Sequence, residues 1–560
     1  SSITGIISED TSALAVTKAG AGTLTLSGAN SYTGATTISA GALRAANATA
    51  LGTDALGTSV TSGAALELYH ATGITIGAEA LTLNGDGISS GGALRNISGN
   101  NTYGGLITLA TASRINSDSG TLTLNKSTDA ITGTNINLTI GGSGNTTVST
   151  IISTGSGTLT KDGSGTLTLS GANSYTGATT ISAGVVTAAN NTALGTVAGG
   201  VTVADGAVLQ LSGAITIGAE ALTLNGTGIS SGGALRNISG NNSYAGAITL
   251  STNAVRINSD SDTLTLTGGI TNNAIGLTFG GVGNTTVSTA AIGSGAGTLT
   301  KDGSGTLTLS VANTYTGLTT VSAGSLTYGI NDAISTGAVT VNGSTAILAL
   351  GTYTDTVGAV TLTAGSITGT GSSTQGILTS TSGFTINPAS GVTVSVSANL
   401  AGAVILTKSG AGTAELSGYN AYTGTTTLNT SGGVLAITGS GSLSGTSAGV
   451  YSGAIAIGSG NTFKYSSSTN QTLQTGVISG LGSLIKDTGT SSVLTLTGSN
   501  TYTGVTTINA GTISVGTIGD GGVAGNLGQA ANTATNIVLG GGTLKYTGST
   551  ATSNRAYNNW

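Results

Sequence analysis

The sequence of 560 residues contains no cysteine, no methionine and a single proline, Pro388. Without cysteine the chain has no disulfide framework, no thiolate zinc site and no thiol nucleophile. Proline lacks the N–H that a strand ladder needs, so its near absence favours a chain committed almost wholly to paired strands. No apolar run is long enough to cross a bilayer as a helix.

Charge is also scarce: charged residues make up 6% of the chain, and the formal net charge is −5. Nucleic-acid binding needs clustered Lys and Arg, and membrane-surface binding needs a polybasic segment, so both classes are excluded. The low charge does not indicate disorder, because Leu, Ile, Val and Ala alternate with Thr and Ser throughout. The 97 glycines have no collagen-like period of three.

One stretch of 20 residues recurs along the chain. GTLTLSGANSYTGATTISAG at 22–41 returns letter for letter at 165–184, and it returns as GTLTLSVANTYTGLTTVSAG at 305–324. A catalytic motif normally occurs once per active site, whereas a repeated sequence is typical of a building unit. Each copy follows a lysine and a Gly-rich turn, and there are five such lysines: Lys18, Lys161, Lys301, Lys408 and Lys486.

The Asn-x-Tyr corner of each copy is the candidate structural site. We expect the Asn to satisfy amides of the turn, and the Tyr to cover the corner and bond through its hydroxyl. In an alternative interpretation, exposed tyrosines stack on sugar rings, although the repeat spacing exceeds one coil and argues against a continuous file. The corner residues are Asn30, Tyr32, Asn173, Tyr175, Asn313, Tyr315, Asn420, Tyr422, Asn500 and Tyr502, with looser versions at Asn101/Tyr103 and Asn242/Tyr244.

A longer duplication encloses these repeats. ITIGAEALTLNGDGISSGGALRNISGNNTY at 74–103 closely matches the stretch at 215–244, which indicates segmental duplication. We expect one continuous solenoid over residues 1–560, with super-repeat copies over approximately 74–186 and 215–326 and more diverged repeats over 327–560.

The hydrophobic pattern has a period of two, as in TLTLSG, where Leu24 and Leu26 face one side and Thr23 and Thr25 face the other. Such short strands could form hairpin sandwiches or coil as a solenoid. The units are too small to bury a core alone, and the same residue types recur at the same unit positions, which favours stacking. The predicted fold is therefore all-β, a single long parallel β-helix with about 20–25 residues per coil.

Few residues are candidates for chemistry. The only histidine, His70, has no paired acid nearby, and we expect an exposed residue at a strand end. The stretches GGSGNT and GGVGNT are similar to calcium-binding nonapeptides, but Asn145 and Asn284 stand where those need aspartate. Recurrent Thr-x-Thr pairs could present ordered hydroxyls to ice, although Thr is also the ordinary polar residue of strands. We expect no cofactor, no metal and no catalytic residue.

Acidic residues are too few to build an evident catalytic cluster. Asp260 and Asp262 form the tightest pair, with Arg256 nearby, and the matching place in the other copy has Asp118 and Arg114. We interpret both places as turns in which the arginine and the aspartate form a surface ion pair.

LTKDGSGTLTLSGANSYTGATTISAG at 159–184 resembles the passenger-associated β-strand repeat of bacterial autotransporters. The elements that carry the resemblance are the Lys-Gly turn, GTLTLSG, NxYTG and TTIxAG. Two copies depart from the pattern: GTAELSGYNAYTGTTTLNTSGG after Lys408 is expected to spoil one strand, and DTGTSSVLTLTGSNTYTG after Lys486 lengthens a turn. The resemblance implies a right-handed parallel β-helix that is exported across the outer membrane to the bacterial cell surface.

We therefore expect a non-catalytic cell-surface structural protein, a stalk or adhesin shaft like an autotransporter passenger. Two alternatives stay open: a filament or surface-layer subunit joined head to tail through solenoid ends, and a carbohydrate-active enzyme on a β-helix scaffold. The partners expected are further copies of the chain, end to end or side by side, and a host or surface glycan or protein receptor. Nucleic acid and a membrane-spanning segment are not expected.

Overall fold

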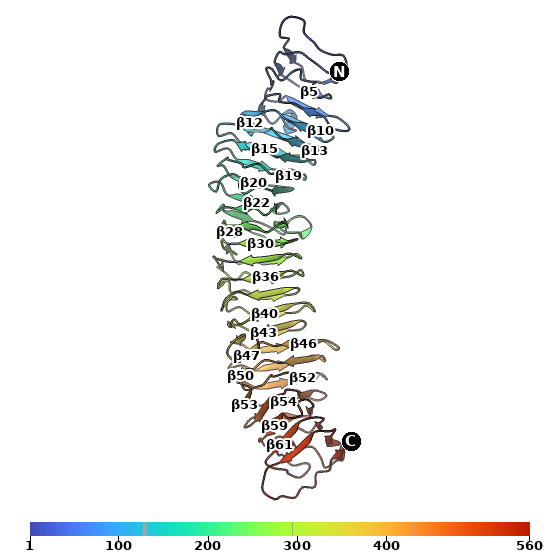
Figure 1. The fold of residues 1–560 in the computed structure, drawn as a ribbon, viewed down its shortest axis with the longest axis vertical. Coiled ribbons are helices and arrows are strands. Elements are labelled where there is room, and N and C mark those ends of the chain that lie inside the picture. The colour runs from blue at the N-terminus through green and yellow to red at the C-terminus, as the bar shows by residue number, and fades with distance from the viewer. Residues whose placement is uncertain (127–130, 294, 430–431, 560) are drawn as a thin grey trace. The chain divides into compact units, whose positions relative to one another are not determined.

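The computed structural model describes residues 1–126, 131–293, 295–429 and 432–559, which form two compact units. Unit 1 is Ser1–Thr285 and unit 2 is Thr286–Trp560. In both, short strands of successive coils pair in parallel and stack (Figure 1). The predicted class, an all-β parallel solenoid, is confirmed for each unit. The continuity of one solenoid over 1–560, the super-repeat bounds and the handedness stay predictions.

The first repeat shows how a coil is built. β2 (Val16–Lys18) pairs with β4 (Thr36–Ile38) of the next coil, and β3 (Thr23–Leu26) pairs with β5 (Ala42–Ala45). The partners Val16 and Thr36 are 20 positions apart (36 − 16), within the predicted period. The period widens to 28 between Leu66 and Leu94 (94 − 66), because the coil carries an extra loop there.

Alternation along each strand separates the core from the surface. In β19 (Thr166–Leu169) the two leucines are buried and the two threonines are half-buried. Register keeps the inward residues in file: Leu124, Val148, Leu169, Ala188 and Leu211 lie over one another in successive coils of unit 1. The outward positions form ladders of hydroxyls, such as Thr139, Thr160, Thr180, Thr202, Thr223, Thr249 and Thr271.

The two repeats of unit 1 lie on different sheets of the coil. The long strand β12 (Ile107–Ser117) turns a corner: its first half continues the file of β2 and β4, and its second half pairs with β15 (Leu138–Gly141). β15 leads to β18 (Leu159–Lys161), so Lys161 is one sheet away from the file of Lys18. Figure 1 shows β15, β20 (Thr179–Ile181) and β22 (Val201–Val203) one above another along this second file.

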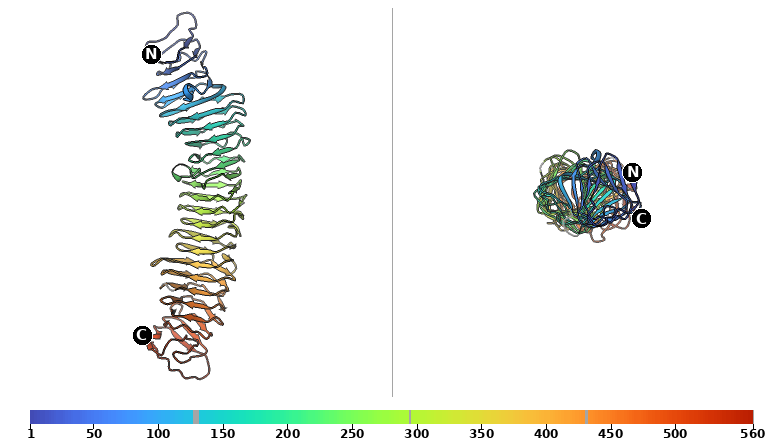
Figure 2. Two further views of the ribbon diagram at one scale, coloured as in Figure 1. Left: turned by 180° about the vertical axis from the view of Figure 1, so that it is seen from behind. Right: turned by 90° about the horizontal axis from the view of Figure 1, so that it is seen from above.

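In unit 2 the third and fourth repeats share a sheet. β35 (Leu299–Lys301), β37 (Thr319–Val321) and β39 (Val339–Val341) begin a ladder that runs on to β48 (Leu406–Lys408). Lys486 lies on another ladder, at the end of β58 (Ser483–Lys486). Figure 2 shows the strands of this unit from behind as stacked arrows.

One departure from the repeat does not have the expected effect. The stretch GTAELSGYNAYTGTTTLNTSGG was expected to spoil one strand, but it forms β49 (Thr413–Leu416) and β51 (Thr426–Leu428), and β49 pairs with β46 (Thr393–Val396) and β52 (Val434–Ile437). The prediction was wrong because Ala414 and Leu416 still point inward and are fully buried, while Glu415 takes an outward position. Residues 430–431 of this repeat lie outside the described residues.

Helical structure is confined to three single 3₁₀ turns in the described part of the chain: η1 (Ile88–Ser90), η2 (Ile229–Ser231) and η3 (Ala534–Asn536). None of these has the length and apolar character that crossing a bilayer requires. The first two belong to the extra loops of the duplicated stretch.

Neighbouring residues of one strand should differ sharply in their effect on stability. Leu167→Ala removes a fully buried side chain of β19 and should destabilise unit 1 by about 2–5 kcal/mol, because a cavity is left between stacked coils. Thr168→Ala, on the outward side of the same strand, should cost less than about 1 kcal/mol. Urea unfolding followed by far-UV circular dichroism measures both. Equal effects would contradict the inward and outward assignment.

Candidate functional site

Each repeat begins with a lysine whose ammonium group lies inside the coil. Lys161 is 2% exposed, and its Nζ donates to the carbonyl oxygens of Asp162 at 2.6 Å, Gly163 at 2.7 Å and Ala183 at 3.2 Å. The first two carbonyls belong to its own Gly-rich turn, and the third belongs to the next coil. The lysine therefore closes its turn and ties the turn to the coil that follows.

The other four lysines make the same kind of contact. Lys18 and Lys301 each donate to two carbonyls of their own turn and one of the next coil. Lys408 donates to two carbonyls of its turn, and Lys486 donates to the carbonyl of Thr488. Burial lowers the pKa of Lys161 and of Lys408 to about 8, because desolvation disfavours the charged form. Sequence reasoning marked these lysines as repeat anchors but assigned them no role.

A glycine of the next coil makes room for the ammonium group. Gly184 has a φ of 70°, and a Cβ at this position would lie 2.9 Å from Nζ of Lys161 and 2.4 Å from the carbonyl oxygen of Gly163. Any larger residue would push the turn and its lysine apart. This contact explains the glycine of the recurring sequence SAG.

The corner asparagine bridges three coils. Oδ1 of Asn173 accepts a hydrogen bond from the N–H of Ile152 at 2.8 Å, and Nδ2 donates to the carbonyl of Ala193 at 2.6 Å. Ile152 precedes the asparagine by one coil, and Ala193 follows it by one coil. The side chain thus joins the coils where no strand ladder does so. The same pair of bonds is made by Asn30, Asn313, Asn420 and Asn500.

The corner tyrosine is buried beside the asparagine. The hydroxyl of Tyr175 lies 2.7 Å from Oγ1 of Thr179, four residues on, and Gly195 of the next coil covers the ring so closely that a Cβ would lie 2.8 Å from Cε2. The hydroxyl–threonine bond recurs at Tyr32, Tyr315, Tyr422 and Tyr502, and all five tyrosines are at most 1% exposed. Their faces are covered, so the alternative of a sugar-stacking platform does not hold for them.

The looser corners keep part of this arrangement. Asn101 and Asn242 still accept a bond from the preceding coil, from Ile74 and Ile215 respectively. Tyr103 and Tyr244 are fully buried, but their hydroxyls have no hydrogen-bond partner in the described part of the chain.

Two of the buried acids that the sequence analysis did not single out lie at equivalent places of the duplicated stretch. Glu79 and Glu220 occupy the same place in the two copies of IGAEALTL and are 3% and 2% exposed. Burial raises the pKa of Glu79 to about 7 and that of Glu220 to about 8. The sequence did contain a signal for these residues, because the same glutamate occurs in both copies of the otherwise uncharged stretch IGAEALTL.

The ion pairs differ from those expected. Asp118 pairs with Arg95 at 2.7 Å rather than with Arg114, because the outward side chains of adjacent coils face each other. Arg114 binds Asp162 at 2.7 Å, and it reaches Asp118 only through the amide of Asn116.

The second copy of the stretch has the equivalent ion pair, because Asp260 pairs with Arg236 at 2.5 Å. Asp262 accepts from the N–H of Gly240 at 2.8 Å. The pairs therefore join one coil to another instead of closing a turn.

The remaining sequence candidates lie in ordinary surroundings. His70 is half-buried just after β7 (Ala65–Tyr69), with Nδ1 3.3 Å from the N–H of Thr72. Oδ1 of Asn145 accepts a hydrogen bond from the N–H of Thr166 at 2.9 Å. Across the ranges that the structure describes, no group of three or more His, Asp or Glu is placed to hold a metal ion.

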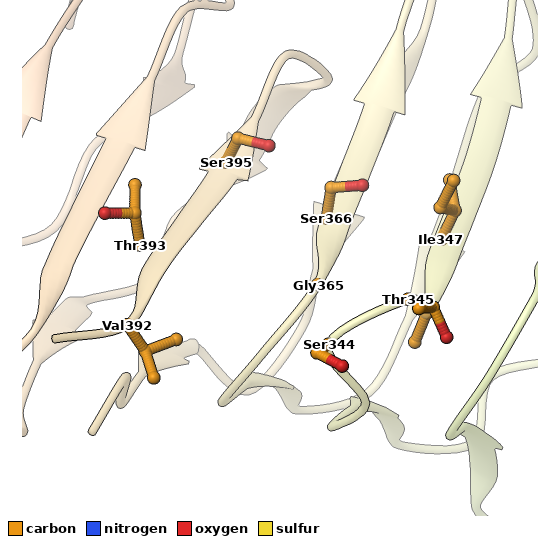
Figure 3. Close-up of a pocket in the computed structure, with 9 residues that line it drawn as sticks. Ser344, Thr345, Ile347, Gly365, Ser366, Val392, Thr393 and Ser395 are labelled. Carbon is orange, nitrogen blue, oxygen red and sulfur yellow. The ribbon is translucent and has the colours of Figure 1, made fainter. Parts of the chain in front are cut away.

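A shallow hollow on unit 2 is lined by hydroxyls (Figure 3). It lies over β40 (Ile347–Gly351), β43 (Ser366–Gly369) and the start of β46. Ser366 and Ser395 are paired in register, and their hydroxyls project over the hollow. Its lining comprises Ser, Thr, Gly, Ala, Val and Ile, so it offers hydrogen bonds but no acid–base pair.

The corner asparagine should contribute much more than an exposed one. Asn173→Leu leaves the N–H of Ile152 and the carbonyl of Ala193 buried without partners, which should cost about 2–4 kcal/mol. Asn145→Leu removes a single bond at an exposed side chain and should cost less than about 1 kcal/mol. Thermal unfolding of both variants tests this, and a neutral Asn173→Leu would contradict the bridging role.

The repeat lysines should resist acylation in the folded chain. Lys161 and Lys408 are buried against carbonyls, whereas Lys545 of β63 (Thr543–Tyr546) is exposed. Acetic anhydride at pH 9, followed by peptide mass spectrometry, should modify Lys545 at least about tenfold faster, because the buried amines react only when a coil opens. The difference should vanish in 8 M urea (roughly the concentration that unfolds most domains). Equal rates in the folded chain would refute this.

Comparison with known proteins gives matches on the repeats themselves. The family Passenger-associated-transport-repeat matches residues 16–45, 159–188, 299–327, 406–437 and 488–515. These five ranges contain all five Asn-x-Tyr corner pairs and four of the five lysines, because the fifth range begins just after Lys486.

One relative is named as an autotransporter adhesin. The "Adhesin BmaC autotransporter" of Brucella suis biovar 1 (strain 1330) is 36% identical over 184 residues, which is 28% of this chain and 5% of the relative. The chain thus spans a small fraction of that protein. No solved structure matches the chain. The five matched repeats and the adhesin relative, on a parallel β-solenoid, support the interpretation of the chain as an autotransporter passenger with passenger-associated repeats.

Proposed function

We propose that the chain is a non-catalytic stalk of a surface adhesin, which holds a receptor-binding region away from the bacterial cell. The observation that carries this proposal is the asparagine that bridges three coils in every repeat. The most strongly repeated side chains, Lys, Asn and Tyr, all point into the coil. Repetition of these three residues therefore serves stacking, and the outward positions of the motif's TLTL strand are threonine hydroxyls.

Stacking of this kind makes length easy to change. Each coil passes its amide hydrogen bonds to the next, so another coil adds one more layer of the same contacts. The identical stretches at 22–41 and 165–184 are consistent with growth by duplication. A stalk whose reach can vary without redesign suits the display of an adhesive region.

The proposed location is the bacterial cell surface, after export across the outer membrane. The name of the Brucella relative supports this location, because it describes an autotransporter adhesin. The absence of cysteine is consistent with it, since disulfides formed in the periplasm would hinder passage of an unfolded chain. The partners that we propose are a glycan or protein receptor and further copies of the chain.

The acids of the duplicated stretch support a non-catalytic role. Asp118, Asp162 and Asp260 are held in ion pairs with arginines, and Glu79 and Glu220 are enclosed in the core. Glycoside hydrolysis requires two carboxyls that flank a bound sugar. Sustained release of reducing ends from a panel of surface glycans by the purified chain would overturn this part of the proposal.

A seamless deletion tests the stalk function. Removal of residues 42–184 joins Gly41 to Val185, so the repeat stays intact across the junction. Six pairing steps lead from Leu24 to Lys161, and at roughly 4.8 Å per coil the deletion should shorten the stack by about 30 Å. The height of an epitope above the surface of displaying cells, measured by super-resolution microscopy, should fall by that amount.

A deletion of residues 42–174 is the matched control, because it joins the chain out of register and should yield a protease-sensitive product. Unchanged epitope height after the seamless deletion, with folding intact, would contradict a stalk. Continuous fibres in electron micrographs of the intact chain would favour the filament alternative instead.

A further inference from the structure

Two buried glutamates at equivalent corners of unit 1 have no part in the proposed stalk function. Oε1 of Glu79 accepts a hydrogen bond from Oγ1 of Thr58 at 2.7 Å, but Oε2 has no partner among the described residues. Glu220 has Val201 in place of that threonine, and its Oε1 likewise has no partner among them. A carboxylate buried in this way is costly, because at least one of its oxygens has neither water nor a donor to solvate the charge.

The next coil packs directly against the backbone of each glutamate. Gly105 passes so near that a Cβ would lie 1.7 Å from the carbonyl oxygen of Glu79 and 3.1 Å from the ring of Tyr103. Gly246 approaches Glu220 in the same way: a Cβ at this position would lie 1.6 Å from the carbonyl oxygen of Glu220. Only glycine permits this closure, and the same coils contribute the buried tyrosines whose hydroxyls have no partner.

The charged and titratable groups around these corners do not offset a negative charge. Asp54 of the preceding coil, which accepts from the N–H of Ala78 at 3.1 Å, adds repulsion at Glu79. Tyr32 and Tyr103 are the other titratable groups that interact with Glu79. Tyr175 and Tyr244 are the titratable groups that interact with Glu220. In the described part of unit 1 neither glutamate forms an ion pair with a basic side chain.

We propose that Glu79 and Glu220 are protonation-controlled latches of the solenoid: the neutral carboxyls keep these corners closed, and their ionisation opens the stacking toward the coils of Tyr103 and Tyr244. The proton passes to solvent, and the carboxylate that remains gains solvation only if the covering coil moves away. Two copies of the latch occur because the stretch is duplicated.

The direction of the pH dependence follows from the two states. In an opened corner the glutamates ionise near their ordinary pKa of 4.5, whereas burial raises the pKa to about 7 for Glu79 and about 8 for Glu220 in the closed corner. The closed state therefore binds more protons between these values. Its stability is greatest below about pH 4.5 and is lost as pH rises through 7 and 8.

Hydrogen exchange of the intact chain measures the opening. After correction for the intrinsic exchange rate, peptides over 73–107 and 214–250 should open at least about tenfold more at pH 8.5 than at pH 5. Glu79→Gln should abolish the effect in the first segment alone, and Glu220→Gln in the second alone. Protection that does not depend on pH, or an unchanged pH dependence in the glutamine variants, would refute the latches.

Reciprocal exchange of the threonine provides a second test that keeps both glutamates. The chain has only five glutamates, so carbon-13 labelling of their carboxyls gives few NMR signals to titrate. Val201→Thr should lower the midpoint of Glu220, and Thr58→Val should raise that of Glu79, because the hydroxyl donates to the carboxylate. Midpoints near 4.5 for both residues in the folded chain would sink the proposal and leave the stalk function untouched.

Discussion

Every coil of this solenoid must pass its backbone hydrogen bonds to the next coil, including at corners where no strand ladder exists. An amide or carbonyl that is buried without a partner costs about 1–3 kcal/mol, so a corner left unsatisfied would open the stack. The repeat meets this requirement with one asparagine. Asn173 accepts from the coil before it and donates to the coil after it.

The lysine and the tyrosine depend on the same constraint. Lys161 places a positive charge under a turn whose carbonyl oxygens point inward, and this contact is closed only because Gly184 lies over it. Tyr175 fills the corner next to the asparagine and uses its hydroxyl on Thr179. The repeat therefore consists of three polar side chains directed inward, together with the glycines that let the next coil approach them.

Coils held together in this way can leave their outward side nearly uncharged. The outward ladders of unit 1 are mostly threonine, and arginine–aspartate pairs join coils around the duplicated stretch. Glu79 and Glu220 differ from the other side chains of these coils, because they are acids buried without an ion-pair partner in the described part of unit 1. Glu79 accepts one hydrogen bond from Thr58, and Glu220 has valine in place of that threonine. A group that destabilises the closed state at neutral pH has a physical consequence whether or not the stalk uses it.

The sequence by itself determined the parallel coil, because alternating aliphatic residues in units too small to fold alone can be buried only by stacking. It also identified the corner residues, through their repetition. Only the tertiary structure decided what those residues bond to, since the partners of Asn173 lie about 20 residues away on both sides. The same holds for the placement of Lys18 and Lys161 on different sheets and for the pairing of Arg114 with Asp162. Which residues meet in neighbouring coils depends on the number of residues in all the turns between them. The sequence of a single repeat does not contain that number.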